Sequence, residues 1–154
     1  MSAKNPEQKR ILVVDDEEGM REMLTMTLRR RGYDVHTASH GREALEVLGA
    51  QPVDIVLSDV RMPELDGLAL LQEIKRSHVP VVVLMMTAFA ELDTAVEALK
   101  LGAADYVSKP FKADEVLLKI QMAEERLRLE EERKALAAEN ARLRGESRES
   151  ASVD

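Results

Sequence analysis

Short apolar runs alternate with amphipathic segments along most of the chain. The runs that begin at Ile11, Ile55 and Val81 are unbroken and rich in β-branched residues and leucine, which is typical of strands buried on both faces. The predicted strands cover residues 11–14, 33–38, 53–58, 80–86 and 105–108. The predicted helices cover residues 17–31, 41–48, 68–77 and a segment around Ala95, Val96 and Leu99, with Gly32, Gly49 and Gly102 as stops. Five strand–helix units with short connections predict an α/β fold whose parallel sheet is covered on both faces.

Polar residues stand where these strands are expected to end. Asp15 and Asp16 follow the first strand, and Asp59 follows the third. Thr87 follows the fourth strand and Lys109 follows the fifth. The carboxyl ends of parallel strands share one edge of a sheet, and ligand sites in open α/β sheets collect there. We therefore expect three carboxylates, one hydroxyl and one ammonium to converge at this edge.

This set of groups suits a divalent cation and a phosphoryl group. Mg²⁺ prefers oxygen ligands, and without it the three carboxylates would repel one another. A carboxylate can attack phosphorus, while Lys109 and Thr87 can contact phosphoryl oxygens. Taken singly, each residue has an ordinary explanation, since aspartates favour helix starts and Lys109 precedes a proline turn. Their combination at successive strand ends carries the inference.

Composition excludes several classes of protein. The 154 residues include 22 Lys and Arg and 29 Asp and Glu, a net charge of −7 without a dense basic block, which argues against direct nucleic-acid binding. The absence of cysteine excludes disulfides and thiolate metal sites. The first ten residues are polar, unlike a signal peptide, and no apolar run approaches the roughly 20 residues of a membrane span. We therefore expect a soluble protein that does not enter a membrane.

The segment from Ala113 to Arg144 contains neither proline nor glycine and predicts one long helix. Leucine or methionine recurs every seven residues, at Met122, Leu129, Leu136 and Leu143. Asn140 occupies the other position of this seam, where a single polar residue can fix register, but Arg126 and Arg133 are poor seam residues. The spacing favours a weak, switchable dimerising helix, and a merely solvated charged helix is the alternative.

Four motifs resemble the receiver domain of two-component response regulators. They are Val-Asp-Asp-Glu at 14–17, Ser-Asp-Val-Arg-Met-Pro-Glu-Leu-Asp-Gly at 58–67, Met-Thr-Ala at 86–88 and Gly-Ala-Ala-Asp-Tyr-Val-Ser-Lys-Pro-Phe at 102–111. The resemblance implies a flavodoxin-like, doubly wound, five-stranded parallel sheet of strand order 2-1-3-4-5. The expected organisation is a disordered N-terminus at 1–9, a receiver domain at 10–124, a helical coiled-coil linker at 125–144 continuous with the fifth helix, and a disordered tail at 145–154.

The resemblance also implies roles for the acidic residues. Asp59 is the expected phosphate acceptor, and its donor is a phosphohistidine on a partner sensor histidine kinase. Asp16 is expected to bind Mg²⁺ directly and Asp15 partly through water. The backbone carbonyl of Arg61 completes the protein ligands.

Four further roles follow from the same resemblance. Lys109 and Thr87 are expected to contact the phosphoryl group, and the Lys109–Pro110 bond is expected to be cis. Tyr106 matches the switch aromatic that turns when Thr87 moves toward the phosphate. Arg61 and Phe89 stand two residues after Asp59 and Thr87, and their bulk is expected to hinder water and prolong the acyl phosphate.

The sequence motifs that begin at Thr94 and Asp105 are most similar to those in receivers of sigma-54-dependent, NtrC-type activators. In those proteins a helical linker leads to an ATPase domain and a DNA-binding domain. Neither domain follows here, so the sequence fits either a fragment or a receiver-plus-coil protein. We expect a cytoplasmic, homodimeric signalling switch that regulates transcription rather than an enzyme with an external substrate. Two alternatives stay open: a dimerisation scaffold that uses no phosphate, and a Mg²⁺-dependent phosphatase, which commonly has an acid where this chain has Arg61.

Overall fold

The computed structural model describes residues 8–88 and 91–152, and five parallel strands form its sheet. The strand order is β2-β1-β3-β4-β5, which confirms the predicted flavodoxin-like, doubly wound topology. The strands are β1 (Arg10–Val14), β2 (Asp34–Ala38), β3 (Ile55–Asp59), β4 (Val82–Ala88) and β5 (Asp105–Lys109).

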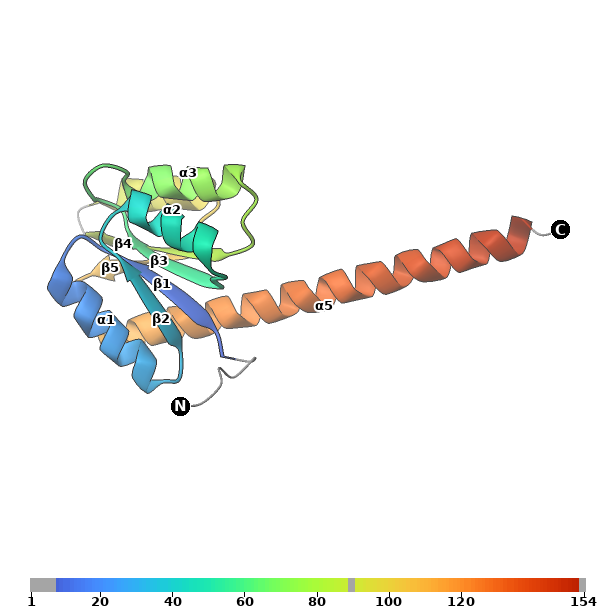
Figure 1. Cartoon of the computed structure of the whole chain (residues 1–154), viewed down its shortest axis with the longest axis horizontal. Coiled ribbons are helices and arrows are strands. Elements are labelled where there is room, and N and C mark those ends of the chain that lie inside the picture. The colour runs from blue at the N-terminus through green and yellow to red at the C-terminus, as the bar shows by residue number, and fades with distance from the viewer. Residues whose placement is uncertain (1–7, 89–90, 153–154) are drawn as a thin grey trace. The chain divides into compact units, whose positions relative to one another are not determined.

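Helices follow each strand and cover both faces of the sheet. They are α1 (Glu18–Arg30), α2 (Gly41–Ala50), α3 (Gly67–Arg76), α4 (Leu92–Lys100) and α5 (Ala113–Ser152). Figure 1 shows α1 and the first turns of α5 on one face and α2 and α3 on the other. The chain divides into two compact units, residues 1–123 and residues 124–154. Within the described residues, no helix combines the length and the apolar character that crossing a membrane requires.

The buried strands place successive side chains on opposite faces of the sheet, because side chains alternate along a strand. Leu12 and Val14 of β1 join the core cluster formed with Leu70, Leu71 and Ile74 of α3. The intervening residues of β1 are equally buried, as are apolar residues of α1 and α5 on the remaining face. A sheet with two buried faces explains why the strands appear in the sequence as continuous apolar runs.

Two local predictions were wrong, both at the ends of elements. Gly49 does not stop α2, because the helix continues through Ala50 and the Gln51 backbone N–H still donates to the Val47 carbonyl. Thr87 lies inside β4, because this strand pairs with β5 as far as Ala88.

The helix predicted around Ala95, Val96 and Leu99 is α4, and the side chains that face the core are Ala95 and Ala98, which are fully buried. Val96 and Leu99 on the same helix are exposed. The small size of the two alanines brings the helix close to the sheet and leaves its larger apolar side chains outside.

The helix α5 extends to Ser152, into the segment 145–154 for which the sequence predicts disorder. Glutamate and arginine, which recur in this segment, are good helix formers, so its polar composition is compatible with a helix. Residues 153–154, and residues 1–7 of the predicted disordered N-terminus, lie outside the described residues.

At the amino ends of β1 and β3, Arg10 and Asp54 fasten the two strands together. The Arg10 backbone N–H and Nε donate to Asp54 Oδ2 at 2.8 and 3.1 Å, and a terminal guanidinium nitrogen donates to Oδ1 at 3.3 Å. Partial burial raises the pKa of the Asp54 carboxyl, but the hydrogen bonds from Arg10 outweigh burial and hold this pKa below its usual value.

Asp54→Asn is expected to lower the free energy of unfolding at neutral pH by about 1 kcal/mol, a modest loss because the pair is partly exposed and screened. A carboxyl whose pKa is lower in the folded chain adds stability above its unfolded pKa and loses it as the pH falls through the folded pKa. The deficit of the variant should therefore shrink below about pH 4, as measured by urea denaturation across pH. Glu46→Gln, which removes an exposed carboxylate of α2, is the control. A deficit unchanged at the lowest pH would contradict this account.

Candidate functional site

The register of the sheet brings the predicted site residues to one edge. Val14, the last residue of β1, pairs with Ser58, so Asp15 follows directly beside Asp59 at the end of β3. In the neighbouring pair, Ala88 of β4 is opposite Lys109, the last residue of β5. Parallel pairing thus gathers side chains that are up to 94 residues apart in sequence.

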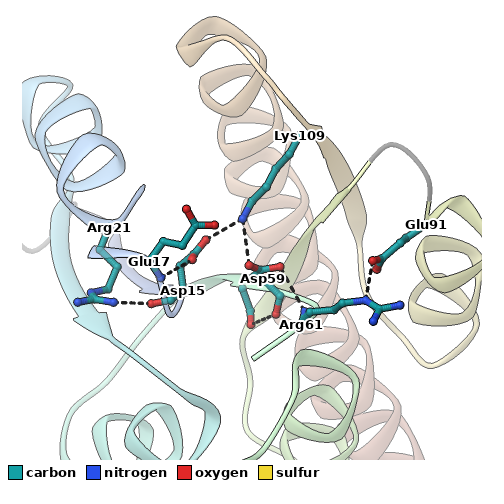
Figure 2. Close-up of polar contacts among 8 residues, drawn as sticks. Asp15, Glu17, Arg21, Asp59, Arg61, Glu91 and Lys109 are labelled. Atoms are coloured by element: carbon teal, nitrogen blue, oxygen red, sulfur yellow. Dashed lines mark hydrogen bonds and ion pairs between the residues drawn. The ribbon is translucent and has the colours of Figure 1, made fainter. Parts of the chain in front are cut away.

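Lys109 lies between two of the predicted carboxylates, as Figure 2 shows. Its Nζ is 3.0 Å from Asp15 Oδ2 and 3.0 Å from Asp59 Oδ2. Asp15 is fully buried and Asp59 is 9% exposed, whereas Asp16 is exposed. The site is therefore an acidic pocket with one open side, where Asp16 stands.

Backbone N–H groups orient the carboxylates of Asp15 and Asp59, and Arg21 holds the backbone of Asp15. Asp15 Oδ1 accepts a hydrogen bond from the Glu17 backbone N–H at 2.9 Å. Arg21 of α1 donates to the Asp15 carbonyl at 2.7 Å. The Arg61 backbone N–H donates to Asp59 Oδ1 at 3.3 Å, so the loop after β3 turns closely around the carboxylate. These contacts leave the pocket preorganised.

Burial has the largest effect on the pKa of the Asp59 carboxyl. Removal from water raises the pKa of the Asp59 carboxyl, and the nearby charge of Asp15 raises it further. The hydrogen bond and charge of Lys109 act in the opposite direction but do not cancel burial. For Lys109, burial lowers the pKa of the ammonium, yet the hydrogen bonds with Asp59 and Asp15 together outweigh burial and raise it.

The charges of the pocket do not balance. With all three carboxylates ionised, Asp15, Asp16 and Asp59 carry three negative charges and Lys109 supplies one positive charge. One carboxylate oxygen from each aspartate lies within 4.8 Å of the other two. A hydrated Mg²⁺ ion suits this donor set, because it binds carboxylate oxygens, keeps several of its waters and supplies the two missing positive charges.

The hydroxyl of Thr87 is buried at the same end of the sheet. Thr87 is 1% exposed, and its Oγ1 has no hydrogen-bond partner within the part of the chain that the structure describes. A buried polar atom without a partner is uncommon and calls for an explanation. One explanation is that this hydroxyl donates a hydrogen bond to an acceptor that enters the site, such as a phosphoryl oxygen.

Tyr106 does not join the pocket directly. It lies on β5 opposite Met85, half-buried, and packs against the core cluster. The Lys109–Pro110 peptide bond is cis, as the resemblance implied. Phe89, the second residue expected to shield the phosphate, lies outside the described residues.

The side chain of Arg61 has a partner that the sequence did not reveal. Its Nε lies 2.5 Å from Oε1 of Glu91, the residue that precedes α4 (Figure 2). Nothing in the spacing of Arg61 and Glu91 marks them as neighbours, because their contact depends on the paths of two loops. The role of Arg21 was missed for the same reason.

Gly67 holds the loop after β3 against the strand that carries Asp59. A Cβ at this position would collide with the Asp59 carbonyl oxygen and lie 2.8 Å from the Cα of Val60. The Gly67 backbone N–H donates to the Val60 carbonyl at 2.8 Å. Only a residue without a side chain permits this approach of backbone to backbone.

Comparisons with known proteins agree with this geometry. The family described as the response regulator receiver domain matches residues 11–121, more than half of the chain. Regulatory protein AtoC of Escherichia coli K12 is 47% identical over 114 residues, which cover 74% of this chain and 25% of AtoC. The DNA-binding transcriptional regulator NtrC of the same strain is 43% identical over 113 residues, which cover 73% of this chain and 24% of NtrC. The predicted likeness to NtrC-type regulators is confirmed, and the chain spans about a quarter of the length of these relatives.

Solved structures show the same likeness. The crystal structure of NtrX from Brucella abortus superposes with a TM-score of 0.80 at 37% identity, covering 84% of this chain and 29% of that one. The isolated receiver domain of that NtrX gives a TM-score of 0.71 at 38% identity, covering 73% of this chain and 96% of the domain. The similarity thus extends over the sheet and the pocket.

Gly67→Ala is expected to destabilise the protein by about 1–3 kcal/mol, because the new methyl group must displace the backbone that carries Asp59. Gly49→Ala is the matched control, since a Cβ at this helical position meets nothing within 4 Å. It should be neutral or stabilising by up to about 1 kcal/mol. Thermal denaturation of both variants measures the two effects, and a Gly67→Ala protein as stable as wild type would show that this close approach is not needed.

Proposed function

Because the chain belongs to the response regulator receiver domain family, we propose that it is a signalling switch driven by phosphorylation of Asp59. The phosphoryl donor is a phosphohistidine on a partner sensor histidine kinase. Mg²⁺, held by Asp15, Asp16, Asp59 and the backbone carbonyl of Arg61, is the required cofactor. The protein catalyses its own phosphorylation and dephosphorylation and turns over no external substrate.

The observation that carries this proposal is the placement of Lys109 between Asp15 and Asp59, at 3.0 Å from each. A buried ammonium beside one carboxylate would form a neutral structural pair. A pocket of three carboxylates and one ammonium keeps a negative excess, which favours binding of a divalent cation and, with it, of a phosphoryl group. The pKa of the Asp59 carboxyl is raised chiefly by burial, and the nearby charge of Asp15 adds to this effect.

The reaction is an in-line transfer of a phosphoryl group. An oxygen of the Asp59 carboxylate attacks phosphorus, the bond from phosphorus to the imidazole nitrogen breaks, and its electron pair returns to that nitrogen. Bound Mg²⁺ supplies positive charge for the carboxylates and the phosphoryl oxygens. Lys109 contacts a phosphoryl oxygen as a cation, and the backbone N–H of Arg61 keeps Asp59 in position.

Thr87 and Tyr106 convert phosphorylation into a change of surface. The phosphoryl group brings about two negative charges and new acceptor oxygens. The buried, unpartnered hydroxyl of Thr87 gains a hydrogen bond by moving toward them. Tyr106, half-buried on the adjacent strand, turns into the space that Thr87 leaves, which biases the surface of α4, β5 and α5 between two arrangements.

We further propose that the helix beyond the receiver domain pairs with the same helix of a second copy. The receiver domain covers residues 10–124 and the linker covers 125–144. The seam begins at Met122, near the end of the receiver domain, and continues through the linker. Its residues are all exposed, at 49–65%: Met122, Leu129, Leu136 and Leu143. A stripe of exposed large apolar side chains at seven-residue spacing is buried most readily in a coiled coil. Arg126 and Arg133 in the seam keep this dimer weak, so that the state of the receiver can shift it.

The proposed output is transcription. The chain is similar to a transcriptional regulatory protein, ZraR of Escherichia coli K12, at 48% identity, and to the DNA-binding regulator NtrC. An ATPase and a DNA-binding domain, which the resemblance to NtrC-type activators implies, are the partners that such a switch would control. The dimerisation scaffold is the weaker alternative, because it gives no role to Lys109, which lies half-buried between two carboxylates.

Incubation with acetyl phosphate and Mg²⁺ is expected to add one phosphoryl group per chain, measured by intact mass. Asp59→Asn should abolish the addition, and EDTA should do the same by removing the cation. Asp93→Asn, which changes an exposed aspartate on α4, should leave it intact. No uptake by wild type would favour the scaffold, and rapid release of many phosphates per chain would favour the phosphatase.

Leu129→Ala and Leu136→Ala are each expected to raise the dimer dissociation constant at least about tenfold, because each removes one buried leucine per subunit from the seam. Glu131→Ala changes an exposed residue on the opposite side of the seam and should leave the constant unchanged. Sedimentation equilibrium measures these constants, with and without beryllofluoride and Mg²⁺ as an acyl-phosphate mimic. Equal constants for wild type and both leucine variants would refute the coiled coil.

A further inference from the structure

The helix α4 is held less firmly than its neighbour α3. Its buried side chains are the two alanines Ala95 and Ala98, whereas α3 buries Leu70, Leu71 and Ile74. Fewer buried apolar groups mean a lower cost of displacement. The larger apolar side chains of α4, which are Leu92, Val96 and Leu99, are 39–48% exposed and so contribute less than fully buried ones would.

The first turn of α4 is also poorly capped. At the start of α3, the Asp66 side chain accepts a hydrogen bond from the Ala69 backbone N–H at 2.8 Å. At the corresponding position of α4, the side chain of Glu91 makes no capping hydrogen bond. Its carboxylate instead points to Arg61, with Nε and Oε1 at 2.5 Å (Figure 2).

Arg61 belongs to the phosphate site by its backbone. Its N–H donates to Asp59 Oδ1, so the Arg61 side chain begins next to the carboxylate that receives the phosphoryl group. The side chain is 77% exposed and makes its contact away from the pocket, while Glu91 is 20% exposed. One residue therefore connects Asp59 to the start of a helix that buries fewer large apolar side chains than α3.

We propose that the ion pair of Arg61 and Glu91, the Arg61–Glu91 latch, holds the start of α4 in its resting position and opens when Asp59 is phosphorylated. This inference rests on the proposed function. The phosphoryl group adds about two negative charges beside Arg61 and competes with Glu91 for the guanidinium. Exposed ion pairs are weak enough for such an exchange. Loss of the latch leaves α4 with two fully buried alanines, partly exposed larger side chains and no side-chain cap.

The latch must be opened before the phosphorylated arrangement forms, so it lowers the affinity for a phosphate mimic. Glu91→Gln is therefore expected to bind beryllofluoride, in the presence of Mg²⁺, about two- to fivefold more tightly than wild type, the range set by an exposed ion pair. Isothermal titration calorimetry measures this affinity in a chain that has no tryptophan. Glu73→Gln, which breaks the exposed pair of Glu73 with Arg76 on α3, is the matched control and should bind as wild type does.

A double-mutant cycle separates the latch from a general effect of Glu91. In the Arg61→Gln background the latch is already absent, so Glu91→Gln should cause no further change in affinity. The NMR signal of the Arg61 Nε–H gives a second readout. It should shift when beryllofluoride binds to wild type, and in Glu91→Gln it should start near its shifted position.

The outcomes distinguish the latch from the proposed function. If wild type takes up beryllofluoride and Glu91→Gln matches Glu73→Gln, the latch is overturned and the phosphorylation switch stands. The latch is also overturned if Glu91→Gln acts equally in the Arg61→Gln background. If wild type takes up no beryllofluoride with Mg²⁺, the proposed function fails and the latch fails with it.

Discussion

The excess of negative charge at the carboxyl end of the sheet is the constraint on which the site depends. Three aspartates meet there, and one ammonium, that of Lys109, lies 3.0 Å from two of them. The sheet is stable with this arrangement because its two buried faces are apolar along nearly their whole length. The repulsion is confined to one edge, where burial and, to a smaller extent, the charge of Asp15 raise the pKa of the Asp59 carboxyl. A divalent cation bound there would relieve the repulsion.

Backbone groups around this edge hold the negatively charged side chains in fixed orientations. Glu17 and Arg61 each donate a backbone N–H to one of the buried carboxylates. Gly67 lets the loop after β3 lie directly against the strand that carries Asp59. The carboxylates are thus oriented by main-chain groups, which move less readily than side chains.

The sequence predicted the sheet and its site well because both follow from periodicity and from one rule of parallel sheets. Continuous apolar runs identified the buried strands, and the shared edge of their carboxyl ends placed Asp15, Asp59 and Lys109 together. The apolar pattern alone did not indicate which side chains of α4 are buried. Val96 and Leu99 follow an apolar pattern, yet the helix packs through the alanines beside them.

The pattern of apolar and polar residues predicted neither the contacts between loops nor the exact end of α2. Glycine commonly ends helices, but the glycine at 49 continues one, because a helical position with open space around it tolerates the residue. The pairing of Arg61 with Glu91 has no signature in spacing, since two irregular segments that follow different strands bring them together. Secondary-structure propensity and hydrophobic periodicity predict single helices and strands, whereas such contacts depend on the path of the loops between them.

The pair of Arg10 and Asp54 lies at the opposite end of the same strands, where β1 and β3 begin. The Arg10–Asp54 hydrogen bonds therefore hold the strands together at one end of the sheet, and the acidic site lies at the other end. Robustness and responsiveness are consequently properties of different residues in this molecule. Substitutions of Arg10 or Asp54 are expected to change the melting temperature. Substitutions at the acidic end are expected to change the response to phosphorylation, with little effect of one on the other.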